Sequence, residues 1–311
     1  MIISASRRTD IPTYYSEWFI NRVRDGYLYV RNPMNIHQIS KITLSPNVID
    51  GIVFWTKNPI PMMQYLDELN NYAYYFQFTV NAYGKDVEVN VPNKNDVIIP
   101  AFRKLSNRIG RDRVIWRYDP ILLTEKYTID YHVNYFNELA KRLSGYTHKC
   151  IISFVDLYRN TQAHLKELNI LPLGEKEMYE LAERLVEIAN KNDLIVESCA
   201  EKINLEQFGI QHGHCIDCQL FEKILNCKIN ILKDKNQRLE CGCMESIDIG
   251  AYNTCKNGCV YCYANFSKTT VIKNMGAHNP SSPLIFGEVM PDDKIVERKM
   301  FSLKKNQISL F

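Results

Sequence analysis

The sequence predicts an α/β fold, namely a partial or complete TIM-like (β/α) barrel followed by a cysteine-rich C-terminal segment. Three observations predict it: short β-rich runs alternate with amphipathic helical stretches, polar residues follow each run, and nine of the ten cysteines lie between Cys199 and Cys262. Strands that are separated by segments of helical length are typical of βαβ units and a parallel sheet. We therefore expect a barrel over residues 1–203 and a cysteine-rich segment over residues 204–311.

Seven runs rich in β-branched and aromatic residues are the predicted strands of the barrel. They cover residues 2–6, 27–31, 51–56, 74–80, 114–118, 150–155 and 194–198. Between them, apolar residues recur with helical periodicity. The predicted helices cover residues 15–24, 62–70, 131–143 and 176–190. Seven strands fit a barrel or partial barrel better than a short open sheet.

The composition excludes several classes of protein. Of the 311 residues, 46% are hydrophobic and 23% are charged, which excludes a disordered chain and a coiled coil. The net charge of +3 is too small to indicate a nucleic-acid partner. The first residues lack the pattern of a signal peptide, and no apolar run approaches the ~18 residues of a membrane span. We expect a soluble, cytoplasmic protein without a membrane partner.

Polar side chains follow the predicted strands, and their candidate roles differ. In α/β barrels the carboxyl ends of the strands form the active-site face, although any strand that meets solvent can end in polar residues. Lys57 and Arg117 are candidates for binding a carboxylate or phosphate, since cationic side chains suit such anions. Asp119 either takes part in catalysis or holds Arg117 in place. The candidates for binding a cofactor or the substrate are Arg7, Arg8, Asp10, Asn32 and Asn81.

Three cysteines near the C-terminus have the spacing of an iron–sulfur site. Residues 255–262 read CKNGCVYC, so Cys255, Cys259 and Cys262 form a C-x3-C-x2-C motif. Thiolates on so short a loop can bind three corners of a cubane iron–sulfur cluster and leave one iron open to a small molecule. Structural zinc sites use four ligands, commonly from paired C-x2-4-C units. The spacing therefore favours a cluster that binds a further ligand.

The segment TCKNGCVYCYAN resembles the cluster motif of radical S-adenosylmethionine (SAM) enzymes, especially spore photoproduct lyase and its relatives, which also carry a segment similar to WRYDPI. The resemblance implies that Cys255, Cys259 and Cys262 hold a [4Fe–4S] cluster, that SAM binds its open iron, and that Tyr261 lies near the adenine of SAM. It implies cleavage of SAM to methionine and a 5′-deoxyadenosyl radical, which takes a hydrogen atom from a substrate. The implied partners are SAM, an unknown small-molecule or nucleotide-like substrate, and an electron donor such as ferredoxin or flavodoxin.

The position of the motif differs from that in radical SAM enzymes, which carry it after the first barrel strand. Here it lies near the C-terminus, and the first predicted strand leads into SRRTDIP, which contains no cysteine. Either the C-terminal segment folds back over the open end of the barrel, or the order of the elements is permuted. Because a radical generator needs a pocket that excludes water, we expect the cluster loop at that end. Its expected neighbours are Arg7, Asn32, Lys57, Asn81 and Arg117.

Segments spread over essentially the whole chain together resemble a bacterial family, domain of unknown function 1848. They are SASRRTDIP, VFWTKNP, WRYDPI, ESCAE, GHCIDC, ECGCMESIDIG and TCKNGCVYCYAN. The resemblance includes cysteines that match Cys199, Cys215, Cys241 and Cys243. It implies no particular substrate.

Those four cysteines, Cys199, Cys215, Cys241 and Cys243, are the candidates for a second metal site. Four thiolates complete either a second, auxiliary [4Fe–4S] cluster or a zinc site. Buried cysteines can also act simply as small hydrophobic residues, an interpretation that suits Cys150 and Cys227. Gly242 lets the sulfurs on either side of it turn toward one ion. Cys218 or a nearby histidine could replace a member of the set.

Three functions fit these patterns. The first is a radical SAM enzyme on an α/β barrel. The second is a zinc-stabilised binding protein without redox chemistry, and the third is an iron–sulfur protein without radical chemistry. The three-cysteine spacing together with Tyr261 favours the first.

Overall fold

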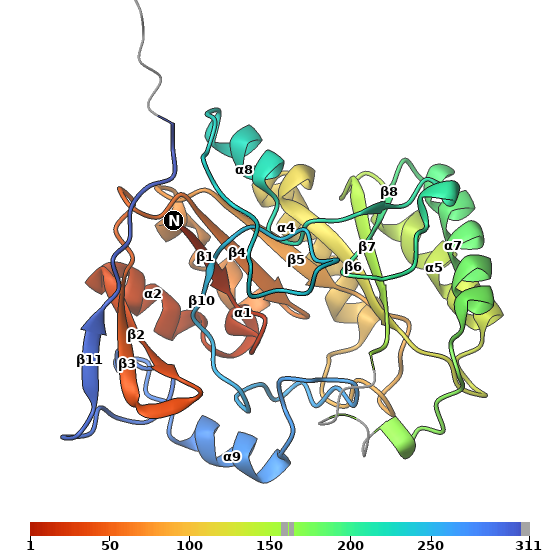
Figure 1. Cartoon of the computed structure of the whole chain (residues 1–311). Coiled ribbons are helices and arrows are strands. Elements are labelled where there is room, and N and C mark those ends of the chain that lie inside the picture. Colours follow the sequence, from red (N-terminus) through yellow and green to blue (C-terminus); the bar gives the residue numbers. More distant parts are fainter. Residues whose placement is uncertain (157–160, 162–164, 306–311) are drawn as a thin grey trace, which may run out of the picture.

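The computed structural model of the chain describes residues 1–156, 161 and 165–305, and its main element is an open parallel β-sheet (Figure 1). Within these residues the sheet has eight strands, in the order β10-β1-β4-β5-β6-β7-β8-β9, and every neighbouring pair is parallel. The strands are β10 (Ile247–Asp248), β1 (Ile2–Ala5), β4 (Gly51–Thr56), β5 (Tyr74–Thr79), β6 (Val114–Ile121), β7 (Lys149–Phe154), β8 (Ile195–Ser198) and β9 (Gln211–His212). The parallel sheet and six of the seven predicted strands are confirmed.

The sheet does not close into a complete barrel, so that alternative of the prediction is wrong for the described residues. The strands β9 and β10 form its two edges and do not pair with each other. Closure requires a continuous ladder with a fixed stagger. Each of these edge strands has only two residues, and the segment that connects them lies on one face of the sheet.

The predicted strand at residues 27–31 belongs to a second, smaller sheet, which corrects its assignment to the barrel. This sheet has the order β11-β3-β2, with β2 at Tyr27–Asn32, β3 at Asn35–Thr43 and β11 at Lys294–Glu297. An antiparallel neighbour needs only a short turn, whereas a parallel neighbour needs a crossover of a dozen residues or more. Since β3 follows β2 at once, β2 forms a hairpin.

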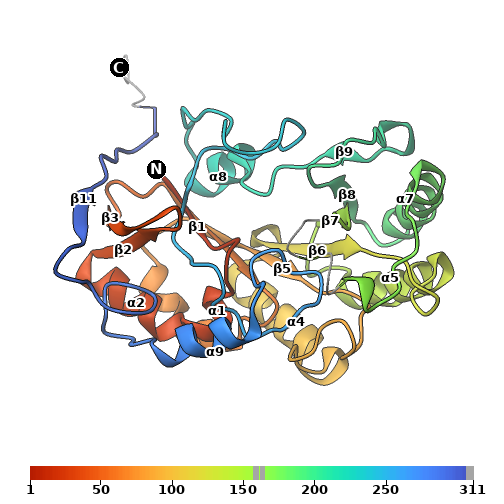
Figure 2. The same ribbon diagram turned by 60° about the horizontal axis from the view of Figure 1, so that its bottom comes forward.

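Helices cover one face of the main sheet (Figure 2). The chain forms α1 (Ile11–Tyr14), α2 (Ser16–Asp25), α3 (Ile60–Met63), α4 (Ile99–Ile109), α5 (Ile129–Leu143), α7 (Glu175–Asn190), α8 (Cys218–Leu225) and α9 (Lys268–Gly276). The prediction for residues 62–70 corresponds to α3 and a separate 3-10 turn at Leu66–Leu69. No helix in the described ranges is long and apolar enough to cross a membrane.

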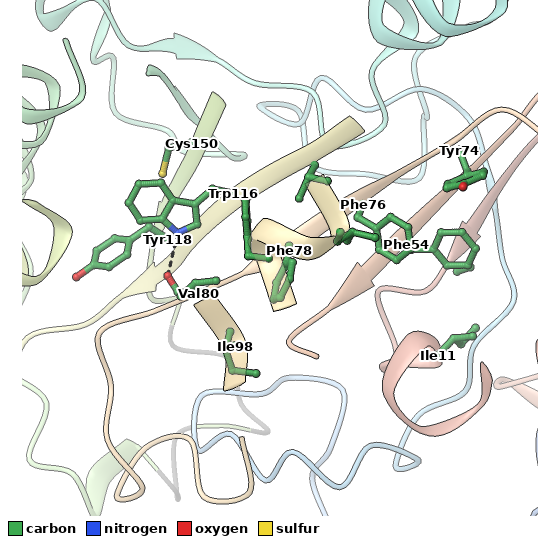
Figure 3. Close-up of a cluster of buried hydrophobic side chains, with 14 of the residues drawn as sticks. Ile11, Phe54, Tyr74, Phe76, Phe78, Val80, Ile98, Trp116, Tyr118 and Cys150 are labelled. Atoms are coloured by element: carbon green, nitrogen blue, oxygen red, sulfur yellow. Dashed lines mark hydrogen bonds between the residues drawn. The ribbon is translucent and has the colours of Figure 1, made fainter. Parts of the chain in front are cut away.

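The core between this sheet face and the helices is built from aromatic side chains (Figure 3). Phe54 and Phe76, from neighbouring strands, stack with ring centroids 4.8 Å apart. Trp116 is fully buried and donates its indole N–H to the Val80 carbonyl at 2.9 Å. Cys150 lies in the same core, where it packs as a small hydrophobic residue.

The opposite face of the sheet is covered by residues 213–245, which include α8 (Figure 2). Because side chains alternate along a strand, Val53, Tyr75 and Ile115 point to this face and pack with Phe221 of α8 and with buried cysteines. Gly51 fits beneath Phe221, since a Cβ at that position would collide with the phenyl ring. The same alternation turns the polar side chains of β5 and β6 toward the cysteines.

Candidate functional site

A cavity of about 470 Å³ lies at the carboxyl ends of the parallel strands. Its walls are residues at or just beyond the carboxyl ends of β1, β4, β6, β7 and β8, together with two groups of cysteines. The volume is in the range of pockets that hold small molecules and cofactors. A larger hollow of about 600 Å³ beside α8 is lined mostly by exposed side chains such as Lys223 and Lys228. We therefore place the candidate site in the cavity at the strand ends.

The first cysteine group is the predicted motif. Cys255, Cys259 and Cys262 all line the cavity, and their loop follows the edge strand β10, which lies parallel to β1. The residues after β5 hold the loop: Val260 donates its backbone N–H to the Val87 carbonyl at 2.9 Å. Asn265 donates from its side-chain amide to the Cys255 carbonyl at 2.7 Å. The loop is thus fixed by the fold before any ligand binds.

A buried carboxylate, Glu88, joins the cysteine loop to the strand ends. Its Oε1 accepts hydrogen bonds from Lys57 Nζ at 2.7 Å and from the Tyr261 hydroxyl at 2.5 Å. Its Oε2 lies 2.9 Å from Lys94 Nζ. Burial by itself would raise the pKa of Glu88, but the charges of Lys57 and Lys94 outweigh it and lower the pKa to about 2. The charge of Lys57 is therefore balanced within the protein.

Glu88 is not among the predicted site residues, because it lies in the loop after β5 and not directly at a strand end. No motif in the sequence marks it. Tyr261 was expected near the adenine of SAM, and its hydroxyl is occupied by Lys57, Glu88 and Asn81. The Tyr261 side chain nevertheless lines the cavity.

Asp10 and Asn81 are hydrogen-bonded to the surrounding backbone. Asp10 accepts from the backbone N–H groups of Thr13 and Lys57 and from the side-chain amide of Asn257, at 2.8–3.1 Å. Burial raises the pKa of Asp10. Asn81 exchanges two hydrogen bonds with the backbone of Asp119, at 2.7 and 2.8 Å. Asp10 lines the cavity, whereas Asn81 is not among the residues that line it and instead holds the backbone of Asp119, which does.

Arg117 reaches from β6 to the second cysteine group. One nitrogen, Nη1, donates to Cys215 Sγ at 2.8 Å and to Gln77 Oε1 at 3.3 Å. The other, Nη2, is paired with the Asp119 carboxylate. Asp119 therefore holds Arg117, and the guanidinium faces a thiol.

Arg7 differs from the other cations that line the cavity. Its guanidinium lies over the Trp55 ring, with Cζ 5.3 Å from the ring centroid. Its Nη2 atom is buried and has no hydrogen-bond partner among the described residues. Arg8 lies over the Tyr252 ring at 5.1 Å, with Nε 4.0 Å from an Asp248 oxygen. A buried guanidinium nitrogen without a partner is the feature expected of an anion-binding position.

The second cysteine group lies on the other side of the cavity. It consists of Cys199, Cys215, Cys241 and Cys243, all of which line the cavity. Cys218 lies in α8 and Cys227 beyond it, and neither lines this cavity. Both cysteine groups and the strand-end residues Arg7, Lys57, Arg117 and Asp119 thus surround one space.

Asn32 does not lie at this site. It ends β2 in the smaller sheet, and its side-chain amide donates to Gln38 Oε1 at 2.9 Å. It is absent from the residues that line the cavity. Asn32 was expected at the site because residues 27–31 were predicted to be a strand of the barrel. Since they form a hairpin strand of the smaller sheet, that prediction for Asn32 is wrong.

A family model with the description "Domain of unknown function (DUF1848)" matches residues 2–264. The matched range contains every strand of the main sheet and all seven cysteines that line the cavity. No curated protein and no solved structure gives a significant match to the chain.

Proposed function

The chain belongs to the DUF1848 family, whose description states no activity, and we propose that it is a radical SAM-type enzyme acting on a small molecule in the cavity at the strand ends. The observation that carries the proposal is the place of the C-x3-C-x2-C loop. The loop follows β10, a strand at the edge of the parallel sheet beside β1, and it faces the cavity.

The position of β10 in the sheet bears on the unusual position of the motif, which lies near the C-terminus of the chain. Radical SAM enzymes carry the motif after the first strand of the barrel. In this chain β10 pairs with β1, with Ile3 opposite Ile247 and Ser4 opposite Asp248. In space, β10 is therefore the strand that precedes β1, although it comes late in the chain. This place of β10 supports a permuted order of elements.

The donor set fits a cluster with one open iron. The three sulfurs of Cys255, Cys259 and Cys262 come from one short loop and face the same cavity. The chemistry that such a cluster and SAM supply together is cleavage of SAM to methionine and a 5′-deoxyadenosyl radical, with one electron from a donor protein of the ferredoxin or flavodoxin type. That radical would take a hydrogen atom from the substrate.

The chain's own residues would shape the pocket and bind charge. Glu88, Lys57 and Tyr261 fix the cysteine loop against the strand ends through the contacts described above. Arg7 offers a buried N–H group to an anionic ligand. Trp55 supplies an apolar surface beneath it.

A zinc-stabilised binding protein is the competing function, and the spacing of the thiols argues against it. Sulfurs about 2.3 Å from one zinc ion lie about 3.8 Å from one another. Within the described residues, the one group of three or more potential ligand atoms within 4.8 Å of each other is His37, Asp292 and Asp293. Neither cysteine group therefore has three sulfurs at the spacing of a zinc site.

The test starts with protein purified and reconstituted without oxygen. Iron, sulfide and zinc are counted per chain in the natural protein and in a Cys255→Ala/Cys259→Ala/Cys262→Ala variant. We expect the variant to lose about four irons. Given SAM and a strong reductant, the natural protein is expected to release 5′-deoxyadenosine. The variant is expected to release none.

The alternatives give different results. Zinc without iron in both proteins would contradict the proposal and favour the binding protein. An iron–sulfur cluster without 5′-deoxyadenosine would leave an iron–sulfur protein with another chemistry. The matched control is Cys150→Ala, because Cys150 lies in the core on the far side of the sheet and is expected to keep both iron and SAM cleavage.

A further inference from the structure

The second group of cysteines spans the opening between the two edges of the main sheet. Cys199 follows β8, while Cys215, Cys241 and Cys243 lie in the segment that connects β9 to β10. This segment covers the sheet face opposite the helices (Figure 2). Four thiols from the chain between β8 and β10 thus meet where the sheet is open.

Their sulfurs are in contact in successive pairs. The Sγ atoms of Cys199 and Cys215 are 3.2 Å apart, and none of the ten cysteines is in a disulfide. The side chain of Cys243 interacts with those of both Cys215 and Cys241. Cys215, Cys241 and Cys243 are each at most 7% exposed. Cys150 shows how a cysteine packs as a hydrophobic residue, alone among apolar side chains. The four thiols of the second group, by contrast, lie next to other thiols.

The backbone around the sulfurs is held in place. The Cys215 carbonyl accepts hydrogen bonds from the Tyr75 hydroxyl at 2.7 Å and from Gln77 Nε2 at 3.0 Å, both from β5. Cys199 donates its backbone N–H to the Ile152 carbonyl at 2.9 Å. A side chain on Gly242 would collide with the His214 ring, so glycine is needed for the turn between Cys241 and Cys243. Such support is typical of preorganised ligand sets.

Two buried guanidinium groups face this group of thiols. Arg117 donates to Cys215 Sγ, as described above. Arg7 lies close enough to Cys215 and Cys243 for electrostatic interaction, and its buried Nη2 has no hydrogen-bond partner among the described residues. Buried cations without compensating charge are unfavourable. Arg117 already has the Asp119 carboxylate as its counter-charge. For Arg7, neutral thiols would supply no such charge, whereas thiolates on a metal centre would.

We propose that Cys199, Cys215, Cys241 and Cys243 bind a second metal centre, a four-thiolate iron–sulfur cluster, with Arg7 as its charge-compensating neighbour and Arg117 as a hydrogen-bond donor to Cys215. A [4Fe–4S] core with four thiolates has a net charge of about −2. Arg7, whose buried Nη2 has no hydrogen-bond partner among the described residues, would balance part of that charge. A single zinc ion is the other centre that four thiolates bind, and the metal count below separates the two. This centre and the C-x3-C-x2-C loop would face each other across one cavity.

The experiment isolates the second centre by removing the first. The full chain carrying Cys255→Ala/Cys259→Ala/Cys262→Ala is reconstituted with iron and sulfide in the absence of oxygen. We expect about four irons per chain and the electron paramagnetic resonance signal of one cluster after reduction. A Cys215→Ser or Cys199→Ser change in this background is expected to remove that iron. Cys218→Ser, three residues away in α8, is the matched control and is expected to keep it.

Each contrary result has a definite meaning. No iron in the triple variant, or full iron after both Cys215→Ser and Cys199→Ser, would overturn the site. About one zinc per chain in place of iron would overturn the iron–sulfur assignment. Circular dichroism of every variant shows whether a loss of iron reflects unfolding. Because the triple variant lacks the first cluster, absence of SAM cleavage in the natural protein would leave this proposal untouched.

A second measurement does not require removal of any ligand. Arg7→Gln in the triple variant is expected to keep the iron and to make the reduction potential of the remaining cluster more negative, since a positive charge nearby favours the reduced state. Arg8→Gln is the matched control, because Arg8 lies against Tyr252 and Asp248. Equal potentials for the two variants would overturn the role of Arg7.

Discussion

Tyr261 and Glu88 are joined by a hydrogen bond of 2.5 Å between the phenol hydroxyl and the carboxylate, although 173 residues separate them in the chain. The bond ties the cysteine loop to the loop that follows β5. Lys57, which follows β4, completes the contact by donating to both oxygens. The wall of the cavity that carries the C-x3-C-x2-C motif therefore depends on one buried ionic cluster.

Replacement of Glu88 tests this cluster. Glu88→Gln leaves two partly buried ammonium groups, Lys57 and Lys94, without their common counter-charge. We expect the free energy of unfolding to fall by about 3–5 kcal/mol, as measured by urea denaturation. Asp86→Asn is the control on the same loop, since Asp86 is 41% exposed and its ion pair with Lys126 should contribute less than about 1 kcal/mol. If Glu88→Gln and Asp86→Asn lowered the free energy of unfolding equally, Glu88 would not be the counter-charge that stabilises this cluster.

Gly250 is expected to control the fit of β10 beside β1. A Cβ at this position would collide with the Ser6 side chain, which donates a hydrogen bond to Asp248 at 2.6 Å. Gly250→Ala should lower the free energy of unfolding by about 1–3 kcal/mol through overpacking. Gly276→Ala, at the end of α9, meets nothing within 4 Å and should be neutral or slightly stabilising. Thermal denaturation of both variants checks the difference.

Phe221 is expected to anchor residues 213–245 to the sheet. It is fully buried, and its ring centroid lies 5.0 Å from that of Tyr75. Phe221→Ala should cost about 3–5 kcal/mol of folding free energy in urea denaturation. Leu239 lies in the same segment and is 89% exposed, so Leu239→Ala should change stability by less than about 0.5 kcal/mol. A small effect of Phe221→Ala would mean that the segment is held by something other than its apolar contacts.

The buried imidazole of His132 is expected to make the folded protein less stable in mild acid. Burial lowers the pKa of His132 from 6.5 to about 4 in the folded protein, where Nδ1 is bonded to the Tyr118 hydroxyl at 2.8 Å. The unfolded chain therefore binds a proton first as the pH falls. The free energy of unfolding should drop by roughly 3 kcal/mol between about pH 6.5 and pH 4 from this group.

The measurement is the melting temperature as a function of pH for the natural protein and His132→Gln, whose acid sensitivity in this range should be weaker. His37→Gln is the control, because His37 is 55% exposed. Glu201 acts in the opposite sense: burial raises its pKa to about 7, so its contribution to stability decreases as the pH rises. An unchanged pH profile in His132→Gln would contradict the assignment of a neutral, buried imidazole.

Local patterns in the sequence predicted most of the sheet and several helices. The runs at residues 51–56 and 74–80 correspond to β4 and β5, and the periodic stretches at residues 131–143 and 176–190 correspond to α5 and α7. These elements are long and consistently patterned, so a local signal is sufficient. The strands β9 and β10 have two residues each, which is too short for any period to be recognised.

The sequence by itself determined the parallel α/β class, the motif at Cys255, Cys259 and Cys262, and the polar residues that end the strands. Only the tertiary structure decided that the sheet stays open, that β10 lies beside β1, that Asn32 belongs to another sheet, and that Glu88 joins the cysteine loop to Lys57. The physical reason is the range of each interaction. Helix and strand periodicity arises between residues a few positions apart, whereas strand order and buried ion pairs form between residues that meet only when the whole chain has folded.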